Sequence, residues 1–267
     1  MMTDNPVMLI TGASSGIGAA TAQLFARHGY RVVLAARREE RLRSLADKIH
    51  TEGGHALPVR VDVTELDSIK IMVDQSLKTF GQIDLLFNNA GFARQKWLEE
   101  MAPDRDISLQ SGVNLLGLIQ VTRAVLPSMI QCRHGHIINM SSMAAFVAPP
   151  TYTVYSATKY AVRGFSEALR REVSVWGIKV STIYPASVDT EFSLHTEANY
   201  QSDFLYPKAF RLSAEKVAQT ILRVARSPKR DVILPRMMVF AKWLNIFLPG
   251  WIDAMIERKF IRPERGM

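Results

Sequence analysis

The sequence predicts one α/β domain, in which a doubly wound parallel sheet of about seven strands carries helices on both faces. Short apolar runs alternate with longer stretches of helical spacing along most of the 267 residues. The apolar runs are continuous, which is typical of parallel strands buried on both faces. Strands that alternate with helices form right-handed crossover units, so the sheet is expected to be parallel and single.

The predicted elements follow one another in a regular order. Strands are expected at residues 7–11, 31–35, 56–61, 83–88, 136–141, 179–184 and 231–235, each followed by turn or capping residues. Helices are expected at residues 16–27, 39–50, 66–80, 103–130, 152–175 and 214–225. Two segments interrupt this order, namely a polar and aromatic insertion at residues 186–212 and an apolar and basic tail at residues 236–267.

Charge and cysteine content narrow the possible partners. The formal net charge is +8, and Cys132 is the single cysteine. One cysteine excludes an intrachain disulfide and a multi-cysteine metal site, so we expect no metal and a reducing compartment. The first strand begins at Val7, which leaves no room for a secretory leader and favours the cytoplasm. The basic residues are scattered rather than clustered with aromatics, so an anionic cofactor or membrane surface fits better than nucleic acid.

A glycine-rich turn joins the first strand to the first helix. Residues 11–18 read Thr-Gly-Ala-Ser-Ser-Gly-Ile-Gly. Glycines permit a tight turn and a close approach of the backbone to a diphosphate, and the free N–H groups of the helix N-terminus favour negative charge. The strand–turn–helix context favours a dinucleotide site over an ordinary turn. The expected cofactor contacts are Gly12, Ser14, Ser15, Gly16, Ile17 and Gly18.

The end of the second strand indicates which dinucleotide binds. An acidic residue near this point usually binds the ribose 2′-hydroxyl of NAD, but Ala36 stands there, followed by Arg37 and Arg38. A guanidinium beside the ribose binds a 2′-phosphate through charge-assisted hydrogen bonds, and Ser14 and Ser15 offer hydroxyl donors. The alternative is that both arginines are the solvated start of the next helix. We therefore predict NADP(H) in preference to NAD(H).

Tyr155 and Lys159 are four residues apart on a predicted helix, so both project from one face. A neighbouring ammonium favours the phenolate and is expected to lower the tyrosine pKa from its usual value near 10. Such a tyrosine can donate a proton to a carbonyl oxygen, or accept one from an alcohol.

Three motifs together resemble the short-chain dehydrogenase/reductase family: Thr-Gly-x-x-x-Gly-x-Gly, the Asn-Asn-Ala-Gly of residues 88–91, and Tyr-x-x-x-Lys. The resemblance covers roughly residues 7–235. It implies a Rossmann-like dinucleotide-binding and catalytic domain over residues 1–235, with a substrate lid at about 186–212. Residues 236–267 then form a helical C-terminal extension. The implied reaction is hydride transfer between a nicotinamide and a carbonyl or alcohol carbon.

The resemblance also implies a catalytic set of Asn114, Ser142, Tyr155 and Lys159. Ser142 lies thirteen residues before Tyr155, just past a strand, and would hold the substrate oxygen beside Tyr155. Ser141 is the competing candidate for that role. Asn114 lies in Gly-Val-Asn-Leu-Leu-Gly and would disturb its helix and hold a water that relays protons to Lys159; the alternative is a satisfied core amide.

Further cofactor contacts are implied at the ends of three strands. Asp62 would bind the adenine amino group and Val63 would flank the ring, whereas Asn89 would stabilise the sheet. Ala90 and Gly91 would pass close to the adenosine ribose, and Val188 and Thr190 would bind the carboxamide of the nicotinamide. Tyr155, Lys159 and Pro185 complete the implied cofactor contacts. Ala186 stands where the family usually has glycine, and its Cβ disfavours a positive φ, which puts the turn holding Val188 and Thr190 in doubt.

The insertion and the tail predict a hydrophobic substrate. The insertion carries Phe192, Leu194, Tyr200, Phe204, Leu205, Tyr206 and Phe210, which would form a substrate wall or pack in the core. The tail, with Trp243 and Trp251 among its aromatics, is too short and polar to cross a bilayer. It would pack on the body or a partner subunit, lie in a membrane interface, or shape the substrate entrance.

The predicted protein is thus an NADP(H)-dependent oxidoreductase acting on a hydrophobic ketone, aldehyde, steroid or lipid-like alcohol. A non-catalytic dinucleotide-binding regulator or scaffold of the same fold is the alternative. The complete Asn114, Ser142, Tyr155 and Lys159 set favours the enzyme, because a binding protein needs none of these side chains in register. A homodimer or homotetramer is expected from the resemblance.

Overall fold

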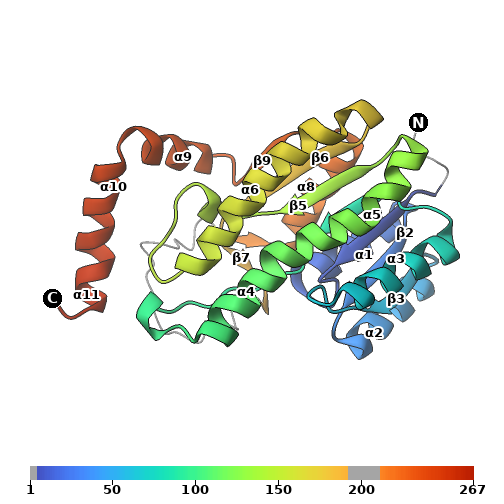
Figure 1. Cartoon of the computed structure of the whole chain (residues 1–267), viewed down its shortest axis with the longest axis horizontal. Helices are drawn as coiled ribbons and strands as arrows, with labels where there is room; N and C mark the ends of the chain where they lie inside the picture. The colour runs from blue at the N-terminus through green and yellow to red at the C-terminus, as the bar shows by residue number, and fades with distance from the viewer. Residues whose placement is uncertain (1–4, 192–210) are drawn as a thin grey trace.

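The computed structural model describes residues 5–191 and 211–267, and it contains one central parallel sheet (Figure 1). The sheet has seven strands in the order β3-β2-β1-β4-β5-β6-β9. Their bounds are β1 (Val7–Thr11), β2 (Arg31–Ala36), β3 (His55–Arg60), β4 (Leu85–Asn88), β5 (His136–Met140), β6 (Lys179–Pro185) and β9 (Asp231–Leu234). Every neighbouring pair is parallel, so the predicted fold class is confirmed.

Helices cover both faces because successive residues of each strand point to opposite sides. Met8 and Ile10 of β1 pack in one buried cluster, whereas Val7 and Leu9 pack in the other. The first cluster is covered by α1 (Gly16–Arg27), α2 (Glu39–Thr51) and α8 (Ala214–Arg226). The second is covered by α3 (Leu66–Phe80), α5 (Leu118–Cys132) and α6 (Thr153–Val173).

The chain order reverses between β1 and β4. From β1 the chain proceeds to β2 and β3 on one side, and from β4 it proceeds to β5, β6 and β9 on the other. Ligands of open α/β sheets bind in the crevice outside the strand ends at such a reversal. The glycine-rich turn follows β1, and the Asn-Asn-Ala-Gly segment follows β4, so both motifs flank this crevice.

The predicted helix over residues 103–130 is continuous but irregular. It comprises a π-helical turn at Pro103–Ser108, α4 (Leu109–Ser111), a second π-helical turn at Gly112–Gly117, and α5. Short 3-10 turns occur at Leu98–Glu100, Met143–Ala145 and Ser174–Trp176. The described ends of the insertion form a small parallel pair of β7 (Val188–Asp189) and β8 (Leu212–Ser213).

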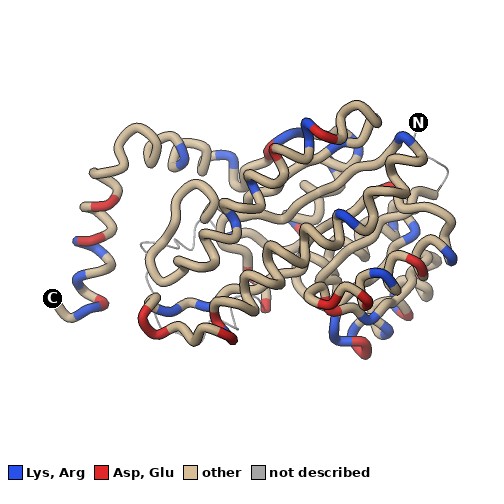
Figure 2. Tube along the Cα trace, viewed as in Figure 1, with Lys and Arg blue, Asp and Glu red and all other residues tan. Residues whose placement is uncertain are grey.

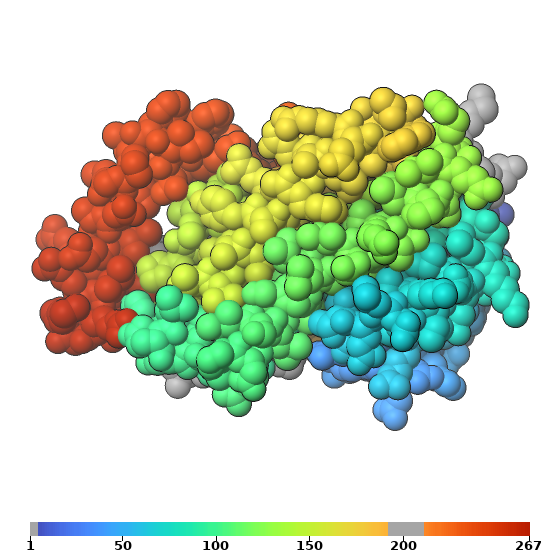
Figure 3. All heavy atoms as spheres, in the orientation of Figure 1, coloured from blue at the N-terminus to red at the C-terminus, as the bar shows by residue number. Residues whose placement is uncertain are grey.

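The tail forms a C-terminal arm of α9 (Met238–Phe247), α10 (Pro249–Ile256), a π-helical turn (Glu257–Ile261) and α11 (Arg262–Glu264). The arm bends by 107° between α9 and the following helical segment. It contacts the body at both ends, where Asn245 donates to the Phe146 carbonyl (3.0 Å) and Phe260 packs near Trp97 (ring centroids 6.3 Å). Figure 3 shows a hollow between the arm and the body.

Candidate active site

The glycine-rich turn adopts a conformation that only glycine fits. Gly12 and Gly16 have φ values of +68° and +53°, in the left-handed region that side chains disfavour. A Cβ on Gly18 would lie 2.2 Å from the carbonyl oxygen of Gly12. The turn therefore brings its backbone tightly around to the N-terminus of α1, whose free N–H groups favour a bound anion such as a diphosphate.

The ends of β1 and β4 are fastened together by side chains. Asn89 donates from Nδ2 to the carbonyl oxygens of Thr11 (3.1 Å) and Gly12 (3.2 Å). Thr11 Oγ1 accepts from the backbone N–H groups of Asn89 (3.0 Å) and Ala90 (3.1 Å). A Cβ on Gly12 would approach Ala90 Cα to 2.9 Å. These contacts hold the glycine-rich turn and residues 89–91 against each other.

Ser142 and Tyr155 meet at the carboxyl end of β5. Ser142 caps the 3-10 turn that follows β5, and its Oγ accepts the N–H of Ala144 (3.1 Å). Its hydroxyl is also hydrogen-bonded to the phenol of Tyr155, on the first turn of α6. Ser141, the competing candidate, instead donates to the Lys159 carbonyl (3.1 Å) and is buried. The structure therefore places Ser142, and not Ser141, beside the tyrosine.

Lys159 lies one turn after Tyr155 and is buried with it. Its Nζ donates to the Met140 carbonyl (3.0 Å) and lies 5.5 Å from the centroid of the Tyr155 ring. A Cβ on Gly91 would lie 3.8 Å from the same Nζ, so the residues after β4 pass close to the ammonium. Lys159 is thus fixed between the end of β5, the tyrosine and residue 91.

Burial shifts both titrating groups toward their neutral forms. It raises the pKa of Tyr155 to about 12, against the opposing hydrogen bond from Ser142. It lowers the pKa of Lys159 from 10.5 to about 8. The sequence-based expectation of a lowered tyrosine pKa is therefore wrong for the protein alone, because removal of the phenol from water outweighs the hydrogen bond with Ser142.

Asn114 lies within the second π-helical turn and is fully buried. Its Oδ1 accepts the N–H of Phe92 (2.9 Å), and its Nδ2 donates to the Phe92 carbonyl (2.8 Å). The family resemblance implies that Asn114 disturbs its helix, and the helix is indeed π-helical at this residue. The side-chain amide is satisfied by the backbone after β4, so its visible role is to position residues 91–92 beside Lys159.

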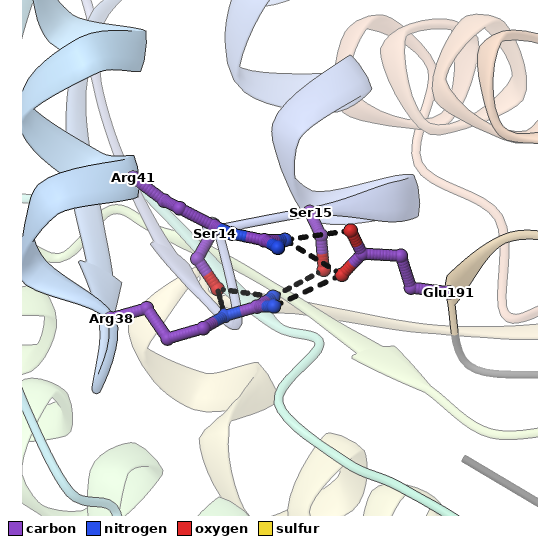
Figure 4. A network of polar contacts seen from close by, with 5 residues as sticks. All are labelled: Ser14, Ser15, Arg38, Arg41 and Glu191. Carbon is purple, nitrogen blue, oxygen red and sulfur yellow. Dashed lines mark hydrogen bonds and ion pairs between the residues drawn. The ribbon is translucent and has the colours of Figure 1, made fainter. Parts of the chain in front are cut away.

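An anion site lies beside the glycine-rich turn (Figure 4). Arg38 donates to Ser14 Oγ (3.1 and 2.9 Å) and Ser15 Oγ (2.7 Å), and its third contact is the carboxylate of Glu191 (3.0 Å). Arg41 binds the same carboxylate (2.6 and 2.8 Å). Arg37 is exposed outside this cluster and acts electrostatically on Asp62. Of the two predicted arginines, the structure brings only Arg38 to the serines.

The remaining predicted cofactor residues occupy the strand ends. Asp62 accepts from the N–H (2.9 Å) and hydroxyl (2.7 Å) of Thr64, and Val63 is buried against Gly117, where an added Cβ would meet it at 2.8 Å. Ala186 follows Pro185 and donates to the Leu234 carbonyl (2.7 Å). Its φ is not positive, since non-glycine residues with positive φ in the described chain are Asn5, Arg133 and Thr151. The turn thus accommodates alanine.

Val188 and Thr190 lead toward the glycine-rich turn. Val188 pairs with Leu212 between β7 and β8. Thr190 lies over the start of α1, because a Cβ on Gly16 would meet its side chain at 3.2 Å. The predicted lid aromatics Phe192, Leu194, Tyr200, Phe204, Leu205, Tyr206 and Phe210 lie outside the described residues.

Three residues of the site were not predicted from the sequence, namely Arg41, Glu191 and Tyr152. Arg41 lies three residues after Arg38, in the first turn of α2, and this spacing could have indicated it. Glu191 is distant in sequence, and no local pattern indicates its pairing. Tyr152 packs edge-to-face on Tyr155 (centroids 5.7 Å) and forms an apolar wall with Ala93 and Ala144.

Comparison with known proteins decides the family. The model of the short chain dehydrogenase family matches residues 6–201. The chain belongs to the short-chain dehydrogenase family. This dehydrogenase is 37% identical to a dehydrogenase/reductase SDR family protein 7-like of Drosophila melanogaster over 97% of the chain and 82% of that protein. It is therefore an oxidoreductase, and its predicted family is confirmed.

Solved structures of the family extend the comparison to cofactors. A short-chain dehydrogenase from Sphingobium yanoikuyae in complex with NADPH is 30% identical, with a TM-score of 0.79 and coverage of 94% of this chain and 95% of that one. One from Burkholderia phymatum in complex with NAD is 28% identical, with a TM-score of 0.83 and coverage of 93% and 96%. Dehydrogenases similar to this one therefore bind either dinucleotide.

Proposed function

We propose that this dehydrogenase is an NADP(H)-dependent carbonyl reductase or alcohol dehydrogenase for a hydrophobic substrate. The observation that carries the cofactor assignment is the cluster of Arg38, Ser14 and Ser15, which already binds an oxyanion, the Glu191 carboxylate. The second strand ends in Ala36 and supplies no acidic group for a ribose 2′-hydroxyl. The glycine-rich turn packs so closely on its neighbours that a side chain fits at none of its three glycines, as expected of a dinucleotide-binding turn.

The residues that would hold the dinucleotide are the glycine-rich turn at the diphosphate, Arg38 with Ser14 and Ser15 at the 2′-phosphate, and residues 89–91 at the ribose. When bound, the nicotinamide supplies or accepts the hydride, and its oxidised ring is positively charged. The proton transfers are carried out by side chains of the protein.

Tyr155 and Ser142 share the work on the substrate oxygen. The Ser142 hydroxyl holds that oxygen beside the phenol, since the two hydroxyls are already hydrogen-bonded. Tyr155 then donates its proton to the oxygen in reduction and accepts one in oxidation. With its pKa lowered to about 8, Lys159 is able to carry or release a proton near neutral pH, and its charged form favours the phenolate.

The surroundings of Tyr155 support an apolar substrate. Tyr152, Ala93 and Ala144 pack with Tyr155 in one hydrophobic cluster, although Lys159 Nζ also lies 5.5 Å from the centroid of the phenol ring. The C-terminal arm contacts Phe146, just after the Ser142 turn, and Trp97, on the segment that follows β4, so it lies near the carboxyl ends of β4 and β5. We propose that the arm borders the substrate entrance.

The proposal includes a cytoplasmic homodimer or homotetramer formed through the helices that carry Asn114 and Tyr155. Leu116 and Tyr160 on these helices are 57% and 41% exposed. From Leu109 to Cys132 the one charged residue is Arg123 (Figure 2). The helix Pro103–Cys132 is long and apolar enough to cross a membrane, yet it packs on the sheet with 39% of its most apolar stretch buried. A partner subunit would cover the rest.

The arm also exposes aromatic residues. Phe240, Trp243, Phe247 and Trp251 are each about half exposed or more. Further along the arm are four basic residues, Arg258, Lys259, Arg262 and Arg265. We propose that this face contacts a second subunit or an anionic membrane interface. Sedimentation of the protein with and without anionic vesicles distinguishes the two.

The deciding experiment follows NADPH and NADH oxidation with a panel of apolar ketones and aldehydes. We expect turnover with at least one apolar carbonyl compound and a higher kcat/KM with NADPH. Tight NADPH binding without turnover of any panel member, in either direction, would favour the non-catalytic binding protein instead.

A further inference from the structure

The anion site beside the glycine-rich turn is occupied by a carboxylate of the protein itself. The carboxylate of Glu191 lies between Arg38 and Arg41, with Oε2 3.0 Å from Arg38 Nη1 and both oxygens within 2.8 Å of Arg41 Nη1. Arg38 reaches Ser14 and Ser15 at the same time. Figure 4 shows all five side chains converging on one point.

The partners of Glu191 lie far away in the sequence and come from the cofactor-binding side of the fold. Arg38 is the N-cap of α2, and Arg41 is in its first turn. Glu191 comes from the opposite wall of the crevice, directly after Thr190, which itself packs over Gly16. The ion pairs therefore tie the segment of residues 188–191 across the glycine-rich turn.

A carboxylate and a phosphate monoester present the same groups to a guanidinium. Both accept paired, charge-assisted hydrogen bonds, and both are ionised at neutral pH. Hydrogen bonds from Arg41 and Arg38 hold the pKa of Glu191 at about 2. Because the guanidinium of Arg38 already binds both serines and the carboxylate, the site cannot bind a phosphate in the same place until the carboxylate leaves.

Building on the proposed NADP(H) preference, we propose that Glu191 is an internal competitor for the 2′-phosphate site and that Arg41 is a second arginine of that site. A nucleotide with a 2′-phosphate displaces the Glu191 carboxylate and frees residues 188–191 from the glycine-rich turn. A nucleotide without this phosphate leaves the ion pairs intact. Glu191 therefore lowers the affinity for nucleotides that carry a 2′-phosphate. It also links that phosphate to Val188 and Thr190, the residues predicted to meet the carboxamide.

The test uses nucleotide fragments, so that neither hydride transfer nor the nicotinamide contributes. Calorimetry gives the Kd of 2′,5′-ADP and of 5′-AMP for the full-length parent and for Glu191→Gln. Both partly exposed ion pairs are lost in the variant, so we expect 2′,5′-ADP to bind about three- to tenfold more tightly. The affinity for 5′-AMP is expected to change less than about twofold. An unchanged or weaker affinity for 2′,5′-ADP would overturn the proposal.

Two further variants separate displacement from a general charge effect. Glu39→Gln removes one negative charge from α2, the helix that carries Arg41. Because Glu39 binds Arg43 rather than the anion site, this variant is expected to bind 2′,5′-ADP with the parent affinity. Glu191→Asp keeps the charge but cannot reach both arginines equally well, so it should also tighten 2′,5′-ADP binding. If Glu39→Gln tightens 2′,5′-ADP binding as much as Glu191→Gln does, charge alone explains the gain and the competitor role is rejected.

Arg41 is tested in the Glu191→Gln background, where its ion pair with the carboxylate no longer contributes. Adding Arg41→Gln is expected to weaken 2′,5′-ADP binding about threefold or more and to leave 5′-AMP unchanged. Equal losses for both fragments would remove Arg41 from the phosphate site.

The two proposals fail separately. If the parent uses NADH as well as NADPH, but Glu191→Gln still tightens 2′,5′-ADP binding, the cofactor preference is wrong and the competitor role stands. If the parent prefers NADPH and neither Glu191 variant changes 2′,5′-ADP affinity, the competitor role alone is wrong.

Discussion

Lys159 Nζ lies 5.5 Å from the ring centroid of Tyr155, and burial acts on the two groups in opposite directions along the pH scale. The phenol becomes harder to ionise and the ammonium easier to deprotonate. At neutral pH the phenol is therefore protonated while Lys159 is still mostly charged, and the phenol loses its proton most readily once further positive charge favours the phenolate.

The lowered pKa of Lys159 predicts a pH-dependent stability. Its pKa is 10.5 when unfolded and about 8 when folded, so its contribution to stability is present above pH 10.5 and is lost as the pH falls toward 8. At pH 7 we expect the free energy of unfolding of Lys159→Met to exceed that of the parent by roughly 2 kcal/mol. This figure allows for the loss of the hydrogen bond to the Met140 carbonyl. Urea unfolding from pH 7 to 9.5 measures this, and the difference should shrink as the pH rises. A pH-independent difference contradicts it.

Adjacent serines are predicted to have separate roles. Ser142→Ala should lower kcat/KM by roughly 10²-fold, because the hydroxyl at Tyr155 is lost. Ser141→Ala should retain kcat/KM within about threefold and lose about 1 kcal/mol of stability with its hydrogen bond to Lys159. Steady-state kinetics and thermal unfolding of both variants check the pair. A larger kinetic loss in Ser141→Ala would reverse the assignment.

The glycine-rich turn offers a matched pair of glycine substitutions. In Gly18→Ala the new Cβ would lie 2.2 Å from a backbone oxygen, so the turn must shift and dinucleotide binding should weaken at least about tenfold. In α6 a Cβ on Gly164 meets nothing within 4 Å, so Gly164→Ala should bind as the parent does and gain up to about 1 kcal/mol of stability. Fluorescence titration with NADPH measures both. Parent-like binding by Gly18→Ala would contradict the close packing.

The two arginines after β2 differ in what they touch. Arg38→Ala removes the contacts to Ser14, Ser15 and the anion site, so the NADPH KM is expected to rise about tenfold or more while the NADH KM changes little. Arg37→Ala should have a smaller effect, since Arg37 lies outside the cluster. Equal effects of Arg38→Ala on both cofactors would reject the 2′-phosphate role.

Local patterns predicted the sheet and much of the site because both depend on short-range chemistry. The seven apolar strands, the glycine spacing and the interval between Ser142 and Tyr155 are each readable over a few residues. The predicted and observed ends of some elements differ slightly; for example, β4 begins at Leu85 and not at residue 83.

Tertiary contacts account for what the sequence did not reveal. Glu191 meets Arg41 across 150 residues, and no local pattern encodes that pairing. The raised pKa of Tyr155 depends on how completely neighbouring elements exclude water from the phenol, which spacing alone does not indicate. The C-terminal arm reaches Trp97 through Arg265, whose guanidinium lies 3.8 Å from the ring centroid, and this contact also depends on the folded path of the chain.

In the proposed reaction, the phenol of Tyr155 transfers the proton to the substrate oxygen. The most direct measurement is kcat for Tyr155→Phe beside Tyr152→Phe, with NADPH and the best carbonyl substrate. Tyr155→Phe is predicted to lose at least about 10²-fold in kcat while binding NADPH within about threefold of the parent. Tyr152→Phe, which keeps its ring contact with Tyr155, should turn over near the parent rate. Turnover by Tyr155→Phe at the parent rate would show that the phenol does not transfer the proton.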